Sequence, residues 1–374
     1  MNVLLTGGGT AGHVNPALAI AETIKRNCPE AKIAFVGVKG KKEEDLIPRA
    51  GYKLLFVESA GFQSKLPTPA NIRAAYLAMT SPYAKETTKI LDDFEPDIVI
   101  GTGGYACWPI MSAAARRGIP TALHESNSHP GKTVRRLERR MDRIWTNFKT
   151  TATHLKHPDR VLHVGNPLRG DFSAIDRKAA RQKLGLDDSR TLILSFGGSG
   201  GAASVNTAAL NLMKEFSSKE PSVLHIHATG KNAFEKTIAA FREAGLDQYS
   251  NCIVMDYIYD MPIQMAAADL VISRAGAMTL SELALMKKAA ILIPSPNVAY
   301  NHQYLNAKEL ADADAAVLLA DAEATKPMTL SNTVRKILAD GSKRTRMEKN
   351  IAAFATVDAN KRIWEDIQKI LEMK

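Results

Sequence analysis

The sequence predicts an α/β protein with two doubly wound parallel sheets, and three observations lead to this fold class. Apolar strand-like runs alternate with helical patterns along all 374 residues, which is typical of parallel sheets covered on both faces. A strand, a glycine-rich turn and a helix open each half, at residues 2–25 and again from Thr191. A D-[IL]-V-I strand followed by a small-residue turn then recurs at Asp97 and Asp269. We therefore expect two Rossmann-like domains whose strand ends face a central cleft.

The strands and helices of the first half follow from apolar patterning. Short apolar runs bounded by glycine, proline or polar residues predict buried strands. Pro16 stands where the first helical residue is expected, with a helical pattern continuing to Lys25. Residues 71–91 carry a second helical pattern, which Ser81-Pro82 interrupts. The predicted strands are 2–6, 32–37, 53–57, 97–101, 120–124, 143–146 and 161–164.

The turn after the first strand is a predicted anion site. Gly7, Gly9 and Gly12 let backbone N–H groups and the start of a helix face a phosphate. They fit G-x-G-x-x-G, but no carboxylate follows the strand 32–37 to hold a ribose, which argues against NAD. A tight turn without a ligand is the alternative. His13 at the mouth of the turn favours a ligand, because an imidazole has little packing function there.

The second half opens on a similar unit. A strand at Thr191–Ser195 leads into Gly197-Gly198-Ser199-Gly200-Gly201 and then into a helix. The turn fits G-x-S-x-G, the nucleophile elbow of hydrolases, which would need an acid and a histidine downstream. His225 and His227 alternate inside a predicted strand instead. We favour a phosphate site, because a serine among glycines can bind phosphate through its hydroxyl and the N–H groups.

Residues 273–282 combine a strand end, a small-residue turn and the start of a helix. The N–H groups offer a further anion site. Glu282, one turn into the helix, can accept both hydroxyls of a ribose, or can simply favour the helix N-terminus. Polar residues also follow two predicted strands, at 124–127 and 301–303. Enzymes of this class hold reacting groups at such places, although ordinary loop polarity is the alternative.

Glycine and proline at residues 164–169 suggest a domain boundary. We expect a first domain over residues 1–166 and a second over 167–344. The charged helical pattern at 345–374 is expected to pack back on the first domain.

Composition indicates a folded protein of the cytosol. Apolar residues make up 45% and charged residues 24% of the chain. Apolar runs stay short of the roughly 18 residues that a membrane helix needs. We expect no leader segment, because a strand pattern follows Met1 directly. The D-x-D pattern at 312–314 predicts a surface turn rather than a metal site. Three cysteines lie far apart, without metal-ligand spacing: Cys28, Cys107 and Cys252.

The formal net charge of +10 lies mainly in the first half. It fits an anionic membrane surface or a phosphorylated substrate. Nucleic acid is disfavoured, because helix-turn-helix, zinc and RNP motifs are lacking and aromatic residues make up only 6%. The basic segment 132–143 could help seat the first domain on anionic lipid, although an ordinary amphipathic helix is the simpler interpretation. Apolar residues that could join it are Ile72, Tyr76, Leu77 and Met79.

Six motifs occur in order along nearly the whole chain: Gly7-Gly8-Gly9-Thr10-Ala11-Gly12-His13-Val14-Asn15-Pro16, Gly103-Gly104-Tyr105, His124-Glu125-Ser126-Asn127, Gly165-Asn166-Pro167-Leu168-Arg169, Gly197-Gly198-Ser199-Gly200-Gly201-Ala202 and residues 273–282. In this order they resemble the MurG family of bacterial N-acetylglucosaminyltransferases, in glycosyltransferase family 28. The resemblance implies a GT-B fold and an inverting transfer of GlcNAc from UDP-GlcNAc to the C4 hydroxyl of MurNAc in lipid I, undecaprenyl-pyrophosphoryl-MurNAc-pentapeptide. The product would be lipid II for peptidoglycan synthesis.

The resemblance also implies how the protein is used. It implies that no metal or other cofactor takes part, and that the protein attaches peripherally to the cytoplasmic face of the bacterial cell membrane. Expected partners are UDP-GlcNAc, lipid I, the anionic membrane surface and other cell-wall synthesis proteins, but no nucleic acid.

Carried over by motif, the resemblance implies roles for individual residues. Arg169 and Ser199 would face the diphosphate, Ile258 the uracil and Glu282 the ribose, while Asn127, His302 and Gln303 would lie near the sugar. Further contacts to the nucleotide sugar are implied for Thr10, Ala11, Gly12, Ala277, Met278, Thr279, Leu280 and Ser281. The acceptor pyrophosphate is expected at Gly8, Gly9, Gly103, Gly104 and Tyr105. The attacking hydroxyl needs a general base with a pKa near neutrality, for which His13 is our first choice and Glu125 the second.

Three positions depart from the family pattern. Gly200 replaces a glutamine, Ser126 replaces the glutamine of H-E-Q-N, and Val134 stands where asparagine is common. Two other enzymes remain possible: a UDP-GlcNAc 2-epimerase, which would act without an acceptor, and a family-28 transferase for another lipid such as diacylglycerol. A basic binder that releases no UDP is disfavoured by the glycine turns in both halves.

Overall fold

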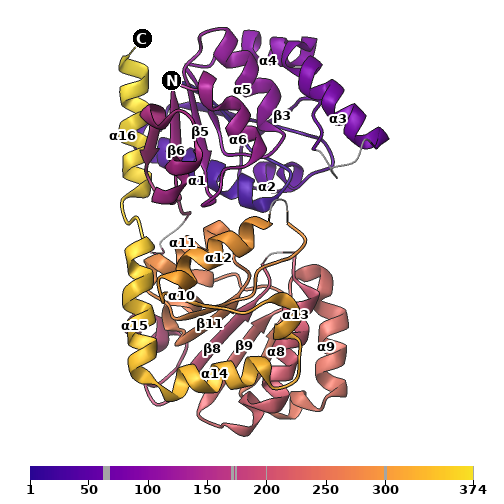
Figure 1. Ribbon diagram of the computed structural model, residues 1–374, viewed down its shortest axis with the longest axis vertical. Coiled ribbons are helices and arrows are strands. Elements are labelled where there is room, and N and C mark those ends of the chain that lie inside the picture. Colours follow the sequence, from indigo (N-terminus) through magenta and orange to yellow (C-terminus); the bar gives the residue numbers. More distant parts are fainter. Residues whose placement is uncertain (62–67, 170–171, 173–174, 199, 299–300, 374) are drawn as a thin grey trace. The chain divides into compact units, whose positions relative to one another are not determined.

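The chain forms two compact units, each built on its own sheet, in a computed structural model (Figure 1). The first unit comprises Met1–Arg169 together with Asp358–Lys374, and the second comprises Gly170–Val357. The structure describes residues 1–61, 68–169, 172, 175–198, 200–298 and 301–373. The predicted α/β class with two parallel sheets is confirmed.

The first unit is built on a seven-stranded parallel sheet with the order β3-β2-β1-β4-β5-β6-β7. The apolar runs form strands because both faces are buried: Leu4 packs on one side, whereas Val3 and Leu5 pack on the other. The order reverses between β1 and β4, whose carboxyl ends therefore form the switch point where such sheets bind ligands. The strands are β1 (Asn2–Thr6), β2 (Lys32–Gly37), β3 (Lys53–Phe56), β4 (Ile98–Gly101), β5 (Thr121–Glu125), β6 (Arg143–Thr146) and β7 (Val161–His163).

Helices cover both faces of this sheet (Figure 1). They are α1 (Ala11–Asn27), α2 (Glu43–Arg49), α3 (Pro69–Thr80), α4 (Lys85–Phe94), α5 (Cys107–Arg116), α6 (Lys132–Leu137) and α16 (Ala359–Glu372), with 3₁₀ turns at η1 (Ser81–Tyr83), η2 (Glu138–Arg140), η3 (Lys149–His154) and η4 (Pro158–Arg160). The apolar stripes of α1, α2 and α16 pack with Val3 and Leu5. The other face carries α4, α5 and α6. The predicted interruption at Ser81-Pro82 is confirmed by η1.

Helix α1 begins at Ala11, and the expectation that Pro16 opens it is wrong. The carbonyl of Thr10 accepts hydrogen bonds from the N–H groups of His13 (3.1 Å) and Val14 (3.2 Å), so helical turns form ahead of the proline. Pro16 removes a donor inside the helix, but strong burial of the following apolar residues holds the segment helical. The glycine turn is consequently shorter, and its last residues already belong to the helix.

The second unit repeats the same strand order in a six-stranded parallel sheet, β10-β9-β8-β11-β12-β13. Its switch point lies between β8 and β11, as that of the first sheet lies between β1 and β4. Strand β10 is not among the predicted strands. It is only partly buried, and Ile253 in it is 37% exposed. The strands are β8 (Thr191–Phe196), β9 (Val223–Ala228), β10 (Cys252–Met255), β11 (Leu270–Ser273), β12 (Ala290–Leu292) and β13 (Val317–Leu318).

The helices of the second unit pack mainly through small and branched apolar residues. Val205, Ala208 and Leu212 of α8 lie against Ile193 and Ile272 of the sheet. The helices are α7 (Arg177–Lys183), α8 (Ala203–Glu215), α9 (Phe234–Glu243), α10 (Met261–Ala267), α11 (Ala277–Leu285), α12 (His302–Asp312), α13 (Asp321–Ala324), α14 (Thr329–Ala339) and α15 (Gly341–Ile351), with 3₁₀ turns at η5 (Ser217–Lys219), η6 (Lys231–Ala233), η7 (Leu246–Gln248) and η9 (Ala352–Phe354).

The expected single C-terminal helix over 345–374 is instead two helices that belong to different units. Met347 of α15 packs into the core of the second unit. Ile363 and Ile367 of α16 pack in the core of the first unit, where α16 contacts α1. Figure 1 shows α16 running along the side of this unit. The extended backbone of Ala355 ends the first of these segments, because the two apolar stripes cover two separate cores.

An aspartate precedes the strand on the far side of the switch point in both sheets. Asp97 Oδ2 accepts the N–H of Asn2 at 2.6 Å, and Asp269 Oδ2 accepts the N–H of Leu192 at 2.8 Å. The recurring D-[IL]-V-I pattern therefore marks equivalent positions, at the opposite sheet edge from the glycine turns.

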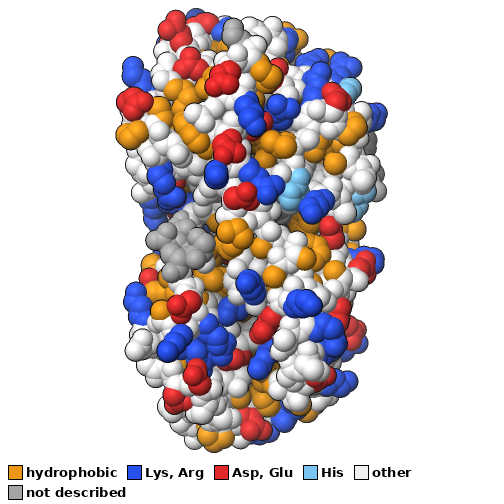
Figure 2. All heavy atoms as spheres, turned by 90° about the vertical axis from the view of Figure 1, so that its left-hand side faces the viewer, with side chains coloured by type: hydrophobic (Ala, Val, Ile, Leu, Met, Phe, Trp, Pro, Cys, Tyr) orange, Lys and Arg blue, Asp and Glu red, His pale blue; other side chains and the backbone are white. Residues whose placement is uncertain are grey.

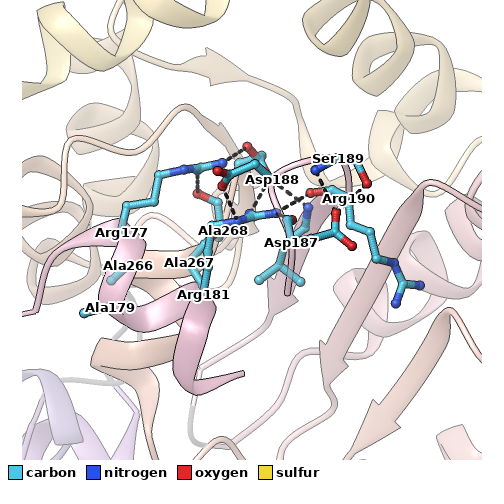
Figure 3. Close-up of polar contacts among 12 residues, drawn as sticks. Arg177, Ala179, Arg181, Asp187, Asp188, Ser189, Arg190, Ala266, Ala267 and Ala268 are labelled. Atoms are coloured by element: carbon cyan, nitrogen blue, oxygen red, sulfur yellow. Dashed lines mark hydrogen bonds and ion pairs between the residues drawn. The ribbon is translucent and has the colours of Figure 1, made fainter. Parts of the chain in front are cut away.

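Asp269 also anchors an ionic cluster, in which Asp269 and Arg181 are buried and Arg177 is exposed. Arg177 and Arg181 pair with it at 2.6 and 3.2 Å. Their guanidinium groups donate to the carbonyls of Ala268 and Ala267 at the end of α10 (Figure 3). Cations at a helix C-terminus offset its negative dipole end, so the cluster fixes α10 on the sheet.

The surface features agree with the composition. Asp312 pairs with Lys308 and Asp314 with Arg346, so the D-x-D segment is a surface turn. In the parts of the chain that the structure describes, no three His, Cys, Asp or Glu side chains gather as metal ligands do. The described helices are also each too short or too polar to cross a membrane. The three cysteines are free thiols.

Candidate functional site

Two glycine turns contact each other at the switch point of the first unit. They follow β1 and β4 and comprise residues 7–9 and 102–105. A Cβ atom at Gly104 would lie 2.3 Å from the carbonyl oxygen of Gly8, and one at Gly7 would lie 2.0 Å from Thr102 Oγ1. Gly103 and Gly104 have φ values of +100° and +81°, which favour glycine. Side chains at these positions would force the turns apart, so the glycines are required for the close approach.

The imidazole of His13 packs on the second of these turns. A Cβ at Gly103 would lie 2.8 Å from its Nδ1. That nitrogen lies 3.2 Å from the carbonyl oxygen of Thr102. Because a carbonyl can only accept, Nδ1 carries the proton, and in the neutral ring Nε2 carries the lone pair. The structure thus orients His13 in the tautomer that a general base needs.

Tyr105 borders the same place. A Cβ at Gly9, where φ is +86°, would lie 3.1 Å from Tyr105 Cε1. Burial, with a smaller contribution from the charge of Glu43, raises the pKa of the Tyr105 hydroxyl, which keeps it protonated. The first unit therefore brings together the residues predicted for the acceptor pyrophosphate: Gly8, Gly9, Gly103, Gly104 and Tyr105.

Glu125, at the end of β5, organises the following loop. Its Oε1 accepts both the backbone N–H and the side-chain Nδ2 of Asn127, each at 2.9 Å. Its Oε2 accepts the N–H of Gly131 at 2.8 Å, just ahead of α6. Burial raises the pKa of Glu125 while these hydrogen bonds oppose the rise. Both carboxylate oxygens are already engaged, which favours His13 over Glu125 as the base.

Two departures from the family pattern are accommodated by the interior. The Ser126 hydroxyl lies 3.4 Å from Nδ1 of His124, whose Nε2 contacts the Gly165 carbonyl at 2.9 Å. Burial lowers the pKa of His124 to about 4, so this ring is neutral. Val134 is buried in the apolar core, where an asparagine amide would need partners.

Glu43 lies against the first glycine turn, although no motif in the sequence points to it. Its carboxylate accepts the N–H of Gly9 at 2.9 Å and of Val38 at 3.2 Å. The G-x-G-x-x-G pattern calls for an acidic residue at the end of β2, whereas Glu43 reaches back to the turn from the start of α2. The contact joins residues 34 positions apart, so the spacing of the motif does not reveal it.

The corresponding turn of the second unit follows β8. A Cβ at Gly201 would lie 2.2 Å from the carbonyl oxygen of Thr229, so this turn packs on the one after β9. Gly200 is exposed, and the space around its would-be Cβ is open to 4 Å. Ser199, predicted to face the diphosphate, lies outside the described residues.

The histidines of β9 are in the core rather than at a reacting site. Ser195 Oγ lies 2.8 Å from both His225 Nε2 and His227 Nδ1. Burial lowers the pKa of His225 to about 3 and of His227 to about 4. Neutral rings hydrogen-bonded inside a sheet do not serve a serine nucleophile, which favours the phosphate interpretation of the turn.

Helix α11 starts at Ala277, directly after β11 and its small-residue turn. Ala277 and Leu280 point into the core, so only their backbone can face a nucleotide, whereas Met278 and Thr279 are half-exposed. Ser281 Oγ donates to the carbonyl of Ala277 at 3.1 Å. Burial raises the pKa of the Glu282 carboxyl to about 8.

Arg274, one residue past β11, ties neighbouring elements together. It donates to Ser204 Oγ of α8 at 2.8 Å and to the Ile293 carbonyl at 3.0 Å, and it forms an ion pair with Asp321. Its charge is therefore committed to holding the second-unit turns in place. Arg274 lies within the motif at 273–282, but the motif alone indicates no separate role for it.

The other predicted donor contacts are spread over strand ends. Ile258, 5% exposed, follows β10. His302 opens α12, and Gln303 Oε1 accepts the N–H of Ser295 at 2.8 Å. Arg169 ends the first unit, where its guanidinium pairs with Glu22 of α1 at 2.6 Å. Asn127 lies with Glu125 in the first unit. Thr10, Ala11 and Gly12 belong to the same unit and follow β1 of the same sheet, whereas Asn127 follows β5.

Comparisons with known proteins cover the chain from end to end. Residues 3–146 match the glycosyltransferase family 28 N-terminal domain, and residues 192–363 match its C-terminal domain. A curated protein of Acetivibrio thermocellus is 37% identical over 374 residues, which is 100% of this chain and 99% of that protein. One of Alkaliphilus oremlandii is 35% identical, with 100% of both chains covered. Both are named UDP-N-acetylglucosamine–N-acetylmuramyl-(pentapeptide) pyrophosphoryl-undecaprenol N-acetylglucosamine transferase.

Solved structures give the same result for the fold. MurG of Acinetobacter baumannii superimposes with a TM-score of 0.76 at 26% identity, over 98% of this chain and 99% of that one. A UDP-GlcNAc 2-epimerase of Neisseria meningitidis, with a TM-score of 0.65 at 16% identity over 99% of this chain and 100% of that one, shares the fold alone. Full-length identity above a third, together with both domain matches, shows that the chain belongs to glycosyltransferase family 28 and, within it, to the MurG family.

Proposed function

We propose that this protein transfers GlcNAc from UDP-GlcNAc to the C4 hydroxyl of MurNAc in lipid I, and so forms lipid II for peptidoglycan synthesis. The observation that carries the proposal is a sequence identity of 35–37%, over the full length, to curated N-acetylglucosamine transferases. The two sheets supply matching parts, since each places glycine turns on both sides of its switch point.

The donor's nucleotide belongs to the second unit in this proposal. The N–H groups at the start of α11 and of the turn after β8 bind the diphosphate, with the hydroxyl of Ser199. Backbone groups around Ile258 hold the uracil, Glu282 holds the ribose hydroxyls, and His302 and Gln303 hold sugar hydroxyls. These assignments rest on the family motifs, and Ile258 and the start of α11 also follow the ends of β10 and β11.

The acceptor belongs to the first unit. Its pyrophosphate lies on the turns at 7–9 and 102–105, and His13 Nε2 takes the proton from the C4 hydroxyl as that oxygen attacks the anomeric carbon. The attack comes from the face opposite UDP, so the configuration inverts. The Thr102 carbonyl holds the proton on Nδ1, which leaves Nε2 to act as the base. Glu125 orients Asn127 toward the sugar.

The leaving UDP carries developing charge on its diphosphate. Helix N-termini, Ser199 and Arg169 offset this charge without a metal. Arg169 is paired with Glu22 in the ligand-free protein. To contact the diphosphate, its guanidinium must leave Glu22 or bind both groups at once. The proposal therefore includes activity in the presence of a chelator.

The first unit also carries an apolar patch suited to the membrane interface. The α3 patch, which we define as Ile72, Tyr76, Met79 and Tyr83, has side chains 63–75% exposed. The Arg116 guanidinium stacks 3.9 Å from the Tyr83 ring centre, beside this patch. Aromatic and apolar side chains next to cations suit an anionic lipid surface. By contrast, cations and anions intermingle on the face that carries α16 (Figure 2).

Release of UDP from UDP-GlcNAc, with and without a short-chain lipid I analogue and in EDTA, tests the proposal. Release that depends on the analogue, matched by a disaccharide-lipid product, is expected. Turnover without an acceptor would indicate the epimerase, and transfer to diacylglycerol alone would indicate the other family-28 reaction. Strict dependence on added Mg²⁺ or Mn²⁺ would refute the metal-independent mechanism.

A further inference from the structure

We propose that Glu43 is a positioning residue for the acceptor: its buried carboxylate sets the shape of the first glycine turn, and so sets where the pyrophosphate of lipid I can bind. The inference rests on the proposed function, because it concerns the acceptor of that reaction. Glu43 itself does not touch the reacting atoms.

The carboxylate of Glu43 links two strand ends. Glu43 is the first residue of α2 and is fully buried. Oε2 accepts the N–H of Gly9, just past β1, at 2.9 Å. Oε1 accepts the N–H of Val38, just past β2, at 3.2 Å. One side chain therefore joins the acceptor turn to the neighbouring strand.

Two glycines are shaped around this side chain. A Cβ at Gly8 would lie 2.3 Å from Glu43 Oε1, and a Cβ at Gly37 would lie 2.7 Å from Glu43 Cγ. Both distances are far inside van der Waals contact, so only glycine lets the side chain pass. Gly8 of the family motif is thus needed to make room for Glu43, whereas Gly104 is needed for the close approach of the second turn.

A buried carboxylate beside an anion site needs an explanation. Burying the charge is costly unless hydrogen bonds offset the lost hydration, and the N–H groups of Gly9 and Val38 provide them. Because Glu43 takes the Gly9 N–H, that group is not offered to the pyrophosphate. The negative charge also repels a phosphate from the β2 side of the turn. The pyrophosphate is thereby directed to the side of the first turn that adjoins the turn at Gly103–Tyr105, on which His13 packs.

The bond also fixes the backbone conformation of Gly9. Gly9 has a φ of +86°, in the left-handed region where a flexible glycine has many alternatives. The hydrogen bond from its N–H selects one of them. Loss of the acceptor oxygen would let the turn sample others, and the acceptor would have to restore the productive shape on binding.

Steady-state kinetics of E43Q test this, with E44Q as the matched control. Glu44 is the adjacent residue and also accepts a backbone N–H, that of Gly40, but it is exposed and faces away from the turn. In E43Q an amide NH₂ replaces one of the two acceptor oxygens, so one hydrogen bond is lost. We expect the KM for a short-chain lipid I analogue to rise about tenfold. The Kd for UDP, measured by calorimetry, should stay within about twofold, because UDP binds the second unit. E44Q should match the wild type in both.

An acceptor KM in E43Q that is unchanged or lower, with or without a lower Tm, overturns the proposal, since a merely structural staple would move only the Tm. Equal weakening of UDP and acceptor overturns it too. Should E43Q not fold, E43D is measured instead, which keeps both oxygens on a shorter arm, and the same split is expected. Transfer by the wild type and E44Q in the same assay separates the two hypotheses: absence of transfer there refutes the proposed function rather than the positioning role.

Discussion

One carboxylate oxygen of Glu125, Oε1, accepts hydrogen bonds from both the backbone N–H and the side-chain Nδ2 of Asn127, at 2.9 Å each. The other oxygen, Oε2, accepts the N–H of Gly131. The carboxylate is thus a fixed part of the loop that presents Asn127. The motif alone suggests Glu125 as a general base, but in the folded chain both of its carboxylate oxygens already accept hydrogen bonds from the loop.

Replacement of Glu125 by glutamine should therefore lower both kcat and stability. The introduced NH₂ would oppose a backbone N–H, and an unpaired buried donor costs about 1–3 kcal/mol. Denaturant unfolding and transfer assays measure the two effects. E138Q is the control, because Glu138 is also buried and accepts a backbone N–H, that of Lys156, at 2.9 Å. It should lose similar stability yet keep its kcat. A fully active E125Q would contradict the positioning of Asn127.

Replacement of His13 by alanine should reduce kcat by a factor of roughly 10² to 10⁴, the usual contribution of a general base. UDP binding should be unaffected, because the imidazole packs on first-unit turns. Single-turnover transfer measures the chemical step, and calorimetry measures UDP binding. H154A is the control, since His154 is exposed and stacks only on His129. If kcat of H13A stays near that of the wild type, another group is the base.

UDP-GlcNAc should bind more tightly as the pH rises from about 6 to 8. The pKa of Glu282 is about 8 in the ligand-free protein, so its carboxyl is protonated at neutral pH. If the ribose hydroxyls favour the ionised form, binding releases a proton and the affinity rises with pH. Calorimetry in buffers of different ionisation enthalpy measures the proton release, and E282Q should show none.

The same raised pKa affects stability in the opposite direction. The folded state holds this proton more tightly than the unfolded chain, whose usual pKa is 4.5. The contribution of Glu282 to the free energy of unfolding is therefore largest below pH 4.5 and is lost as the pH rises to about 8.

E282A should weaken UDP-GlcNAc binding by about 1–3 kcal/mol, as expected for lost hydrogen bonds to a charged group. Unchanged affinity would refute the ribose role.

Replacement of Gly200 by glutamine, the residue usual in the family, should lower the KM for UDP-GlcNAc. Among the described residues, no atom lies within 4 Å of the new Cβ. The fold should therefore tolerate the side chain, which restores a donor-sugar contact worth about 1 kcal/mol. G341Q is the control, at an equally open glycine in α15. A higher KM would show that the wild-type turn needs its glycine.

Ile72→Ser together with Met79→Ser should reduce binding to anionic vesicles without changing the Tm. Both side chains are exposed, at 63% and 75%, so they contribute little to the core. Each buries apolar area only at a lipid surface, at about 25 cal/mol per Å². Vesicle sedimentation at two salt concentrations measures the binding. The control is Val357→Ser, at an equally exposed apolar residue outside the α3 patch. Equal sedimentation of all three proteins would exclude the patch as the anchor.

Much of the fold was readable from local patterns. Apolar residues between turn-forming residues predict strands such as 2–6 and 32–37, and the structure has them at β1 and β2. The paired D-[IL]-V-I strands predicted two equivalent sheets, since each pattern marks the same place in its sheet. The six ordered motifs predicted the family, which the full-length relatives confirm. All of these signals depend on neighbours in the sequence, which is why they needed no coordinates.

The tertiary structure decided what depends on distant residues. Glu43 reaches Gly9 across 34 positions, and His13 obtains its tautomer from Thr102 across 89. The division of the C-terminal segment followed the two cores that α15 and α16 cover, which lie far from it in the chain. The raised pKa of Glu282 likewise follows from burial. Side-chain reach, ring orientation and desolvation arise only when separate segments pack together, so no local pattern carries them.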